Sequence, residues 1–249
     1  MTRTVPGVSI LAAEIQTGLG GDLGSTWEAL AEGRSAVGPI AGFDTSGFGD
    51  VEGAQVFEEG VQVEDDPALR ILGPHGRLLE RVALAAHEGG GAAALERARV
   101  GLYVALGMVD AVAEDLVPAA RASLDRDGAF DLARFFAGGY RQIHPLWPLS
   151  MLNNVAMGQM AIDLDVRGDN LAMASEADAG VRTLLEGAYA ARDGRVDAAL
   201  IGGVSEPLMP ASLARQRLRG VLREGAAPGE GAASFLIAPA SEQAMACLL

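Results

Sequence analysis

The sequence contains no lysine and only one cysteine, and each scarcity excludes a class of protein. All 19 basic residues are arginine, and they face 33 Asp and Glu residues, so the net charge of the 249 residues is −14. Binding to nucleic-acid phosphates needs a basic face, so this charge argues against DNA or RNA as partner. One cysteine, Cys247, cannot form an internal disulfide or a CxxC metal site. The acidity has two open interpretations, a surface that keeps the protein dispersed and a surface for a basic partner.

Long apolar runs are also missing, although half of the residues are apolar. No run reaches the roughly 18 residues of a membrane span, and no charged-then-apolar leader opens the chain. The hydrophobic content of 49% is that of a packed domain rather than a disordered chain. We therefore expect a soluble, cytoplasmic, globular protein without a membrane partner, forming one domain over residues 1–249.

Short apolar runs alternate along the chain with segments of helical spacing. The runs predict strands at 8–15, 99–106, 170–174, 196–202 and 232–238. The spacing predicts helices that begin at Ser25 and that cover 77–97, 109–118, 151–164, 178–192 and 212–223, the helix at 77–97 being weakened or ended by the glycine triplet at 89–91. Ser25 and Glu28 are spaced as a capping box, residues 33–53 form an ordered loop, and the nearly all-apolar helix 151–164 should be buried. The alternation favours an α/β fold with a mostly parallel sheet covered by helices.

Three familiar site motifs are not satisfied. The chain has no G-x-S-x-G, the signature of the α/β-hydrolase nucleophile. The glycine-rich turn at 18–24 lacks the spacing of a dinucleotide fingerprint. Asp125, Asp127 and Asp131 lack the glycine and glutamate spacing of an EF-hand. We predict neither a cofactor nor a metal site.

The most informative stretch is NLAMASEADAG at 170–180, where a buried strand turns sharply into a helix. Several acyl-transfer enzymes place a nucleophile at such a junction, because the helix dipole and the backbone N–H groups stabilise a thiolate and an oxyanion. This junction has no cysteine. Ser175 and Asp178 have the spacing of an S-x-x-D helix cap, which is the simpler interpretation of these two residues.

Four segments in order along the chain resemble one protein family. They are TWEALAEGRSAVGPIAGFDTSGFG (26–49), LWPLSMLNNVAMGQMAIDLDVRGDNL (146–171), DGRVDAALIGGVSE (193–206) and PGEGAASFLI (228–237). Together they resemble the N-terminal half of β-ketoacyl synthases, the condensing enzymes of fatty-acid and polyketide assembly. The resemblance implies a thiolase-like fold. It covers essentially the whole chain but only about the first half of such an enzyme, so we expect the second half of the family fold to be absent.

The resemblance places the family's catalytic cysteine on Ala177. The family segment is roughly N-L-x-V-S-T-A-C-A-S-G, and Asn170, Leu171 and Gly180 match it. An alanine methyl group cannot form the acyl thioester that condensation requires. The family's two active-site histidines belong to its second half, whereas the three histidines of this chain, His75, His87 and His144, all precede Ala177. We therefore expect no catalytic residue and no enzyme activity of the chain on its own.

A ketosynthase-like chain without its nucleophile resembles a chain-length factor of type II polyketide synthases. That subunit pairs with a catalytic ketosynthase and shapes the acyl tunnel at their interface, while acyl carrier protein delivers the acyl chain mainly through the partner. The half-length form is similar to the short subunits of aryl-polyene or highly reducing systems. Commoner chain-length factors are full length and have glutamine at the cysteine position, and this chain differs in both respects.

The resemblance also names site residues. The strand before the nucleophile position would be an interface strand, or else an internal sheet strand; it comprises Asn170, Leu171, Ala172, Met173, Ala174, Ser175 and Glu176. Candidates for lining the acyl tunnel, which are equally explained as core packing, are Met108, Val109, Val112, Tyr140, His144, Trp147 and Met151.

Two other functions remain open. An independent hydrolase or acyltransferase would use Ser175 or Asp178 together with His144, provided that these groups lie within hydrogen-bond reach. A scaffold subunit would stabilise a ketosynthase without touching its tunnel.

Overall fold

The computed structural model describes residues 7–41, 43–49, 51–56, 67–107, 113–145, 147–174, 177–205, 208–222, 226–240 and 246–248. Its strands are β1 (Val8–Thr17), β2 (Val37–Pro39), β3 (Glu52–Ala54), β4 (Val100–Leu106), β5 (Asn170–Met173), β6 (Ala198–Val204), β7 (Gly231–Pro239) and β8 (Ala246–Leu248). Its α-helices are α1 (Leu23–Ala31), α2 (Pro67–Gly89), α3 (Ala113–Ala122), α4 (Leu132–Ala137), α5 (Asn153–Asp163), α6 (Ala179–Arg192) and α7 (Pro210–Leu218). Short 3₁₀ turns include η1 (Ser46–Phe48), η2 (Ala92–Ala94), η3 (Arg97–Arg99), η4 (Gly139–Gln142) and η5 (Trp147–Met151).

The main sheet has six strands in the order β5–β4–β6–β7–β1–β8. The ladders β5–β4 and β4–β6 are parallel, whereas β6–β7, β7–β1 and β1–β8 are antiparallel. Four strands run in one direction, but the sheet is mixed. The predicted α/β class is confirmed, and "mostly parallel" describes only the β5–β4–β6 side, because β7 inserts between β6 and β1.

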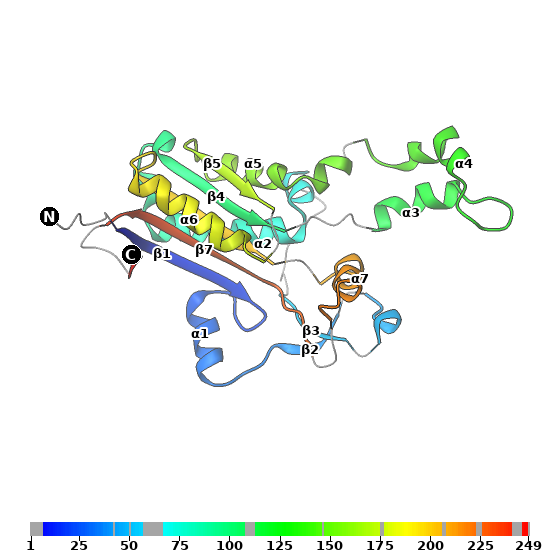
Figure 1. The fold of residues 1–249 in the computed structure, drawn as a ribbon, viewed down its shortest axis with the longest axis horizontal. Helices are drawn as coiled ribbons and strands as arrows, with labels where there is room; N and C mark the ends of the chain where they lie inside the picture. Colours follow the sequence, from blue (N-terminus) through cyan, green and yellow to red (C-terminus); the bar gives the residue numbers. More distant parts are fainter. Residues whose placement is uncertain are drawn as a thin grey trace.

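Helices cover both faces of this sheet (Figure 1). The α2 and α5 face holds the larger core, which includes Leu79, Leu102, Leu200 and Leu236, all with no exposed surface. The α6 face holds a second core. Because successive strand residues point to opposite faces, each core takes alternate residues of the same buried strands. The α6 face is built from Tyr103, Ile201 and Ile237 of the strands and from Ala190 and Ala191 of the helix.

Several predicted helix boundaries are wrong. Helix α1 is capped by Asp22, whose carboxylate accepts from Ser25 N at 2.7 Å, so the capping box is Asp22–Ser25 rather than Ser25–Glu28. Helix α2 begins ten residues before the predicted start and bends at Gly73, where φ is +64° and Pro74 follows. Helix α3 continues through Pro118 to Ala122.

Residues 33–53 are more regular than the predicted loop, because β2 and β3 pair there as a small antiparallel ladder. Helix α5 is less buried than its composition indicates. Ala156 and Met160 are buried, but the side chain of Ile162 is 72% exposed. An apolar helix with one open face is a surface available for a further contact.

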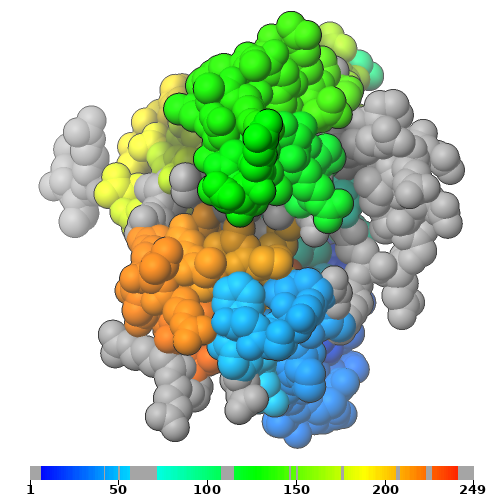
Figure 2. Space-filling view, turned by 90° about the vertical axis from the view of Figure 1, so that its right-hand side faces the viewer, coloured from blue at the N-terminus to red at the C-terminus, as the bar shows by residue number. Residues whose placement is uncertain are grey.

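Residues 113–145, which we call the arm, extend away from the main sheet at the right of Figure 1. Seen from that end, the arm (green) lies above α7 (orange) and the segment around β2 and β3 (light blue) in Figure 2. Phe135 joins Phe130, Phe136 and Tyr140 in an aromatic cluster, with ring centroids 5.3–6.4 Å apart. Phe136 is nevertheless 67% exposed and Phe130 54%. The arm therefore presents aromatic surface outward.

Among the described residues, no helix is both long and apolar enough to cross a membrane.

Candidate functional site

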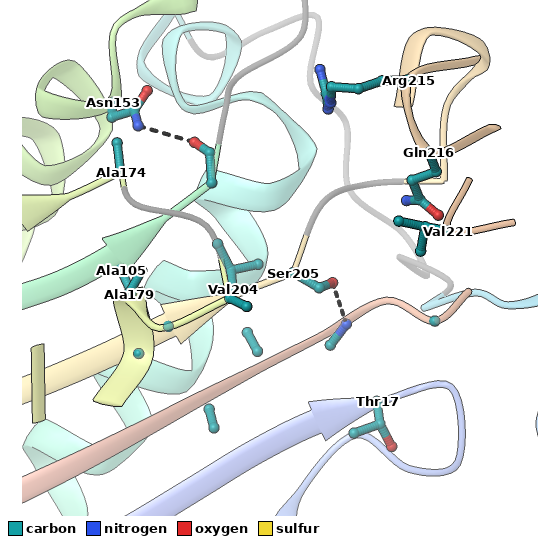
Figure 3. A pocket seen from close by; sticks show the side chains of 18 of the residues that line it. Thr17, Ala105, Asn153, Ala174, Ala179, Val204, Ser205, Arg215, Gln216 and Val221 are labelled. Carbon is teal, nitrogen blue, oxygen red and sulfur yellow. Dashed lines mark hydrogen bonds between the residues drawn. The ribbon is translucent and has the colours of Figure 1, made fainter. Parts of the chain in front are cut away.

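An open cavity of about 1290 Å³ lies where β4, β5 and β6 end (Figure 3). The carboxyl ends of parallel strands meet at one edge of a sheet, which is where α/β proteins commonly bind ligands. Eleven of the 21 lining residues that the structure describes are glycine or alanine, so this part of the floor is made largely of backbone and methyl groups. These are Ala105, Gly107, Ala174, Ala177, Ala179, Gly180, Gly203, Gly229, Gly231, Ala232 and Ala233.

Ala177 is exposed to this cavity, two residues before α6 begins. The N-terminal end of α6 carries the positive end of the helix dipole, the position at which a nucleophile would be activated. An alanine methyl group has no electron pair to donate. In the described residues, β5 ends at Met173 and α6 begins at Ala179, and β5 is exposed or half-buried rather than the buried strand that the sequence predicted.

Asp178 is the N-cap residue of α6, but its side chain makes no capping hydrogen bond. Its carboxylate instead accepts from Arg182 Nε at 2.5 Å, one turn along the helix. The helical i, i+4 ion pair engages the Asp178 carboxylate, and the predicted S-x-x-D cap stays a prediction. Ser175, the other half of that cap, lies outside the described residues.

Three polar side chains of the lining hold the backbone around the cavity. Asn153 Nδ2 donates to the carbonyls of Leu106 (3.1 Å) and Gly107 (3.0 Å), which fixes the end of β4 against α5. Ser205 Oγ accepts from Gly231 N at 2.9 Å and joins the end of β6 to β7. Thr17 Oγ1 accepts from Leu19 N at 3.1 Å. Each stabilises the frame of the cavity.

Helix α7 supplies the most polar part of the wall, through Arg215, Gln216 and Arg219. Figure 3 shows Arg215 and Gln216 across the cavity from Asn153 and Ala174. Sequence patterns alone did not identify these residues. The signal that could have revealed them is the i, i+4 spacing of the two arginines, which places them on one face of a helix.

Comparison with known proteins shows which family this chain belongs to. Residues 6–243 match the family model described as the β-ketoacyl synthase N-terminal domain. The chain belongs to the β-ketoacyl synthase family. A search of curated proteins finds no match.

Solved ketosynthase structures share the fold. A β-ketoacyl synthase from Burkholderia phymatum STM815 superposes with a TM-score of 0.71 at 18% identity, over 94% of this chain and 59% of that one. The ishigamide ketosynthase/chain length factor superposes with a TM-score of 0.70 at 21% identity, over 95% of this chain and 59% of that one. A ketosynthase from module 6 of the bacillaene synthase of Bacillus subtilis 168 superposes with a TM-score of 0.67 at 16% identity, over 93% of this chain and 40% of that one. The chain therefore spans about 40–60% of the length of these structures.

Within this ketosynthase fold, the residues predicted to line an acyl tunnel do not all lie at the cavity. Met151 lines the cavity. Tyr140, His144 and Trp147 are not among its lining residues; Tyr140 and His144 belong to the arm, and Trp147 opens η5. Met108, Val109 and Val112 lie outside the described residues. Their assignment to an acyl tunnel stays a prediction.

The predicted interface strand forms an edge of the sheet. In the described part of the chain, β5 pairs with β4 on one side only. Asn170 is exposed, Leu171, Ala172 and Met173 are half-buried, and Ala174 lines the cavity. Ser175 and Glu176 lie outside the described residues. The position at the edge is compatible with the predicted interface, which stays a prediction.

The independent hydrolase is not favoured. Its acid, Asp178, is engaged by Arg182, and its base, His144, is exposed on the arm and not among the residues that line the cavity.

The clearest pKa shifts lie away from the cavity. Burial lowers the pKa of His87 on α2 and raises the pKa of Tyr103 on β4. A hydrogen bond to Asp197 raises the pKa of Arg99, at the opposite end of β4. None of the three lines the cavity. No group of three or more metal-ligating residues is found among the residues that the structure describes.

Proposed function

We propose that this chain is a non-catalytic, ketosynthase-like partner subunit, a chain-length factor of a type II polyketide synthase of the aryl-polyene or highly reducing type. The observation that carries the proposal is Ala177, which stands at the head of α6 in an open cavity, where a ketosynthase needs a thiol. The fold similarity to the ishigamide ketosynthase/chain length factor supports it.

Two exposed features support a protein partner. The outer edge of β5 can accept a strand from another chain, because main-chain N–H and C=O groups at a sheet edge are templates for pairing. The arm offers Phe130, Leu132 and Phe136, each more than half exposed. Exposed aromatic side chains are the usual anchors of protein interfaces.

The catalytic ketosynthase would supply the cysteine and the histidines, accept an acyl group from acyl carrier protein in the cytoplasm, and condense it with a malonyl unit. This chain would supply the opposing interface and part of the tunnel wall. Met151, which lines the cavity, is the tunnel candidate with the most direct structural support.

Co-expression with a ketosynthase from the same gene neighbourhood tests the proposal. We expect the two chains to elute together on gel filtration, and the pair to elongate malonyl units faster than the ketosynthase alone. Replacing the ketosynthase's own cysteine with alanine should abolish elongation, since this chain provides no nucleophile. Separate elution, with normal elongation by the ketosynthase alone, would contradict the proposal.

A scaffold that leaves the tunnel untouched is the second candidate. Alanine at Met108, Val112, Trp147 or Met151 separates the two roles, because a smaller side chain in a tunnel wall admits a longer acyl chain. Unchanged product length in all four variants would favour the scaffold.

A further inference from the structure

We infer that the outer face of α6 is a surface through which two copies of this chain form a two-fold dimer. This surface, which we call the α6 stripe, consists of Val181, Leu185 and Tyr189. It belongs neither to the arm nor to the edge of β5. The inference therefore goes beyond the proposed function, and it is tested without a ketosynthase.

Helix α6 is apolar on two sides. Its inner side packs on the sheet, where Ala190 and Ala191 join the second core and have no exposed surface. Val181, Leu185 and Tyr189 follow one another at i, i+4 and i+8, so they form a row along the helix. Their exposed fractions are 62%, 45% and 42%. The outer side of a surface helix normally carries polar residues, so this row is an apolar surface that the described residues leave open.

Helix α6 is the only helix of the described residues that contributes to the second core. It lies across the strands in Figure 1 (yellow), and the core takes its helical residues from α6 alone. Ile10 of β1 and Phe235 of β7 pack against the same core and are half-buried. The accessible apolar surface therefore continues from the α6 stripe onto the strands beside it.

The α6 stripe is complementary to itself. In a two-fold interface, residue i of one copy contacts residue j of the other, and j contacts i. When two α6 helices run antiparallel with Leu185 on the axis, each Leu185 meets its own copy. Val181 then meets Tyr189 of the second copy, because the two lie four residues from Leu185 in opposite directions. Each bulky ring has a smaller side chain opposite it.

Charged residues at the two ends of the row favour the same register. Asp178 and Arg192 each lie seven residues from Leu185, so an antiparallel pair places Asp178 of one copy beside Arg192 of the other. A parallel pair would instead bring like charges together at both ends. Asp178 keeps its ion pair with Arg182. Arg192 keeps its ion pair with Asp193. The attraction between the copies adds to these pairs and requires neither group to be free.

A dimer formed by one helix face is weak. Standard interfaces use roughly 20–30 residues a side, so we expect the full 249-residue chain to be monomeric at low concentration and to dimerise as the concentration rises. Sedimentation equilibrium between about 5 μM and about 500 μM measures the dissociation constant. A monomer throughout this range would overturn the inference.

Variants decide whether α6 forms the interface. Leu185→Asp should weaken dimerisation at least about tenfold, because two carboxylates would face each other on the axis. Leu30→Asp, which changes a leucine 56% exposed on α1, is the matched control and should dimerise as the parent does. Circular dichroism checks folding, and Val181→Asp, at a side chain 62% exposed, replaces Leu185→Asp if that variant does not fold. Equal losses in the α1 and α6 variants, or no loss in the α6 variant, would overturn the inference.

Disulfide cross-linking in a Cys247→Ser background tests the register. Leu185→Cys should form a disulfide with its own copy on oxidation, because the axis brings the two Cα atoms within the roughly 7 Å that a disulfide spans. Val181→Cys alone should not, since its two copies lie about 12 Å apart along antiparallel helices. Val181→Cys should cross-link when it is mixed with Tyr189→Cys. A disulfide of Val181→Cys with itself, and none of Leu185→Cys, would contradict the antiparallel pair.

No ketosynthase is present in these measurements. A chain that dimerises through α6 but binds no ketosynthase would refute only the proposed function. A chain that binds a ketosynthase but stays monomeric on its own would refute only the α6 dimer.

Discussion

At the scale of single residues, Ala177 and its neighbours determine what the cavity can do. Ala177 is followed at once by Asp178, whose carboxylate is exposed and paired with Arg182. A negative charge beside the nucleophile position opposes the formation of a thiolate, whereas the α6 dipole favours it. With Ala177 at the nucleophile position, as we propose, the site differs from a thiol-activating one in two adjacent residues.

A cysteine placed at this position should report that balance. In a Cys247→Ser background, Ala177→Cys with Asp178→Asn should have a thiol pKa about 0.5 lower than Ala177→Cys alone, because the neighbouring carboxylate is removed and Arg182 is released. The pH dependence of alkylation by iodoacetamide measures both pKa values. Ala129→Cys, on the arm, serves as the exposed control. An unchanged or higher pKa in the Asp178→Asn variant would contradict this picture of the junction.

His87 makes stability depend on pH. Burial lowers the pKa of this side chain below its ordinary 6.5, so the unfolded chain takes up a proton that the folded chain resists. Stability should be complete above pH 6.5 and should fall as the pH drops through 6.5 towards the lowered value. His87→Gln should flatten this part of the profile. The urea midpoints of unfolding at about pH 7.5 and about pH 5.5 measure this loss of stability, and the exposed His144→Gln is the control. An equal drop in the midpoint between the two pH values in the parent and in His87→Gln would refute the assignment to His87.

At the scale of elements, close backbone packing fixes how β5 joins the sheet. Gly168 precedes β5, and its N–H donates to Val100 O at 2.9 Å at the start of β4. A Cβ at Gly168 would lie 2.4 Å from that oxygen. No side-chain rotation can relieve this contact, because the carbonyl belongs to the backbone.

Gly168→Ala should therefore destabilise the fold by about 1–3 kcal/mol. Gly158→Ala is the matched control. Gly158 lies in α5, and a Cβ added there would have no heavy atom within 4 Å, so alanine should stabilise by about 0.5–1 kcal/mol. Urea unfolding of the two variants gives both values. Similar stabilities would mean that the β4–β5 junction can relax.

The arm is the element that we expect to contact a partner. Phe136→Ser should lower thermal stability only slightly, because the ring is 67% exposed and loses one edge-on contact with Phe135, and should weaken the complex with the ketosynthase at least about tenfold. Trp27→Ser, which changes an aromatic side chain 70% exposed on α1, is the control and should bind normally. Surface plasmon resonance measures both, and equal affinities for the two variants would remove the arm from the interface.

Sequence patterns predicted the buried elements well and the surface elements poorly. The strands at 99–106, 196–202 and 232–238 match β4, β6 and β7 to within two residues, because a largely buried strand has a nearly continuous run of apolar residues. Pro118 did not end α3, although it is the sixth of the ten residues of this helix and lies inside it, so proline alone was a poor guide to the end of the helix. The order of strands depends on long-range pairing, which local patterns do not contain.

The candidate site was predictable only in part for the same reason. The junction at Ala177 follows from a local motif, and Met151 was found through the resemblance. Arg215 and Arg219 were missed because nothing in their own helix indicates that it faces the ends of β4, β5 and β6. That information lies in the tertiary structure.

At the scale of the whole molecule, the described part of the chain is an α/β layer with an aromatic arm, a sheet edge at β5 and a cavity lined in part by Arg215, Gln216 and Arg219. A self-sufficient condensing enzyme needs a thiol at the head of α6, and this chain has a methyl group. The exposed arm and edge are surfaces that a partner can cover. Together these features are the basis of our proposal that the chain is a subunit that shapes a reaction carried out by another chain.

The most direct test of this account is the product length made by the complex with a ketosynthase when Met151 is replaced. Met151 is 39% exposed and lines the cavity, so Met151→Trp should fold normally and narrow the tunnel. Mass spectrometry of the released acyl chains should show a distribution shifted to shorter products than those of the parent complex. An identical distribution, from a complex that forms and turns over normally, would contradict a role for this chain in setting chain length.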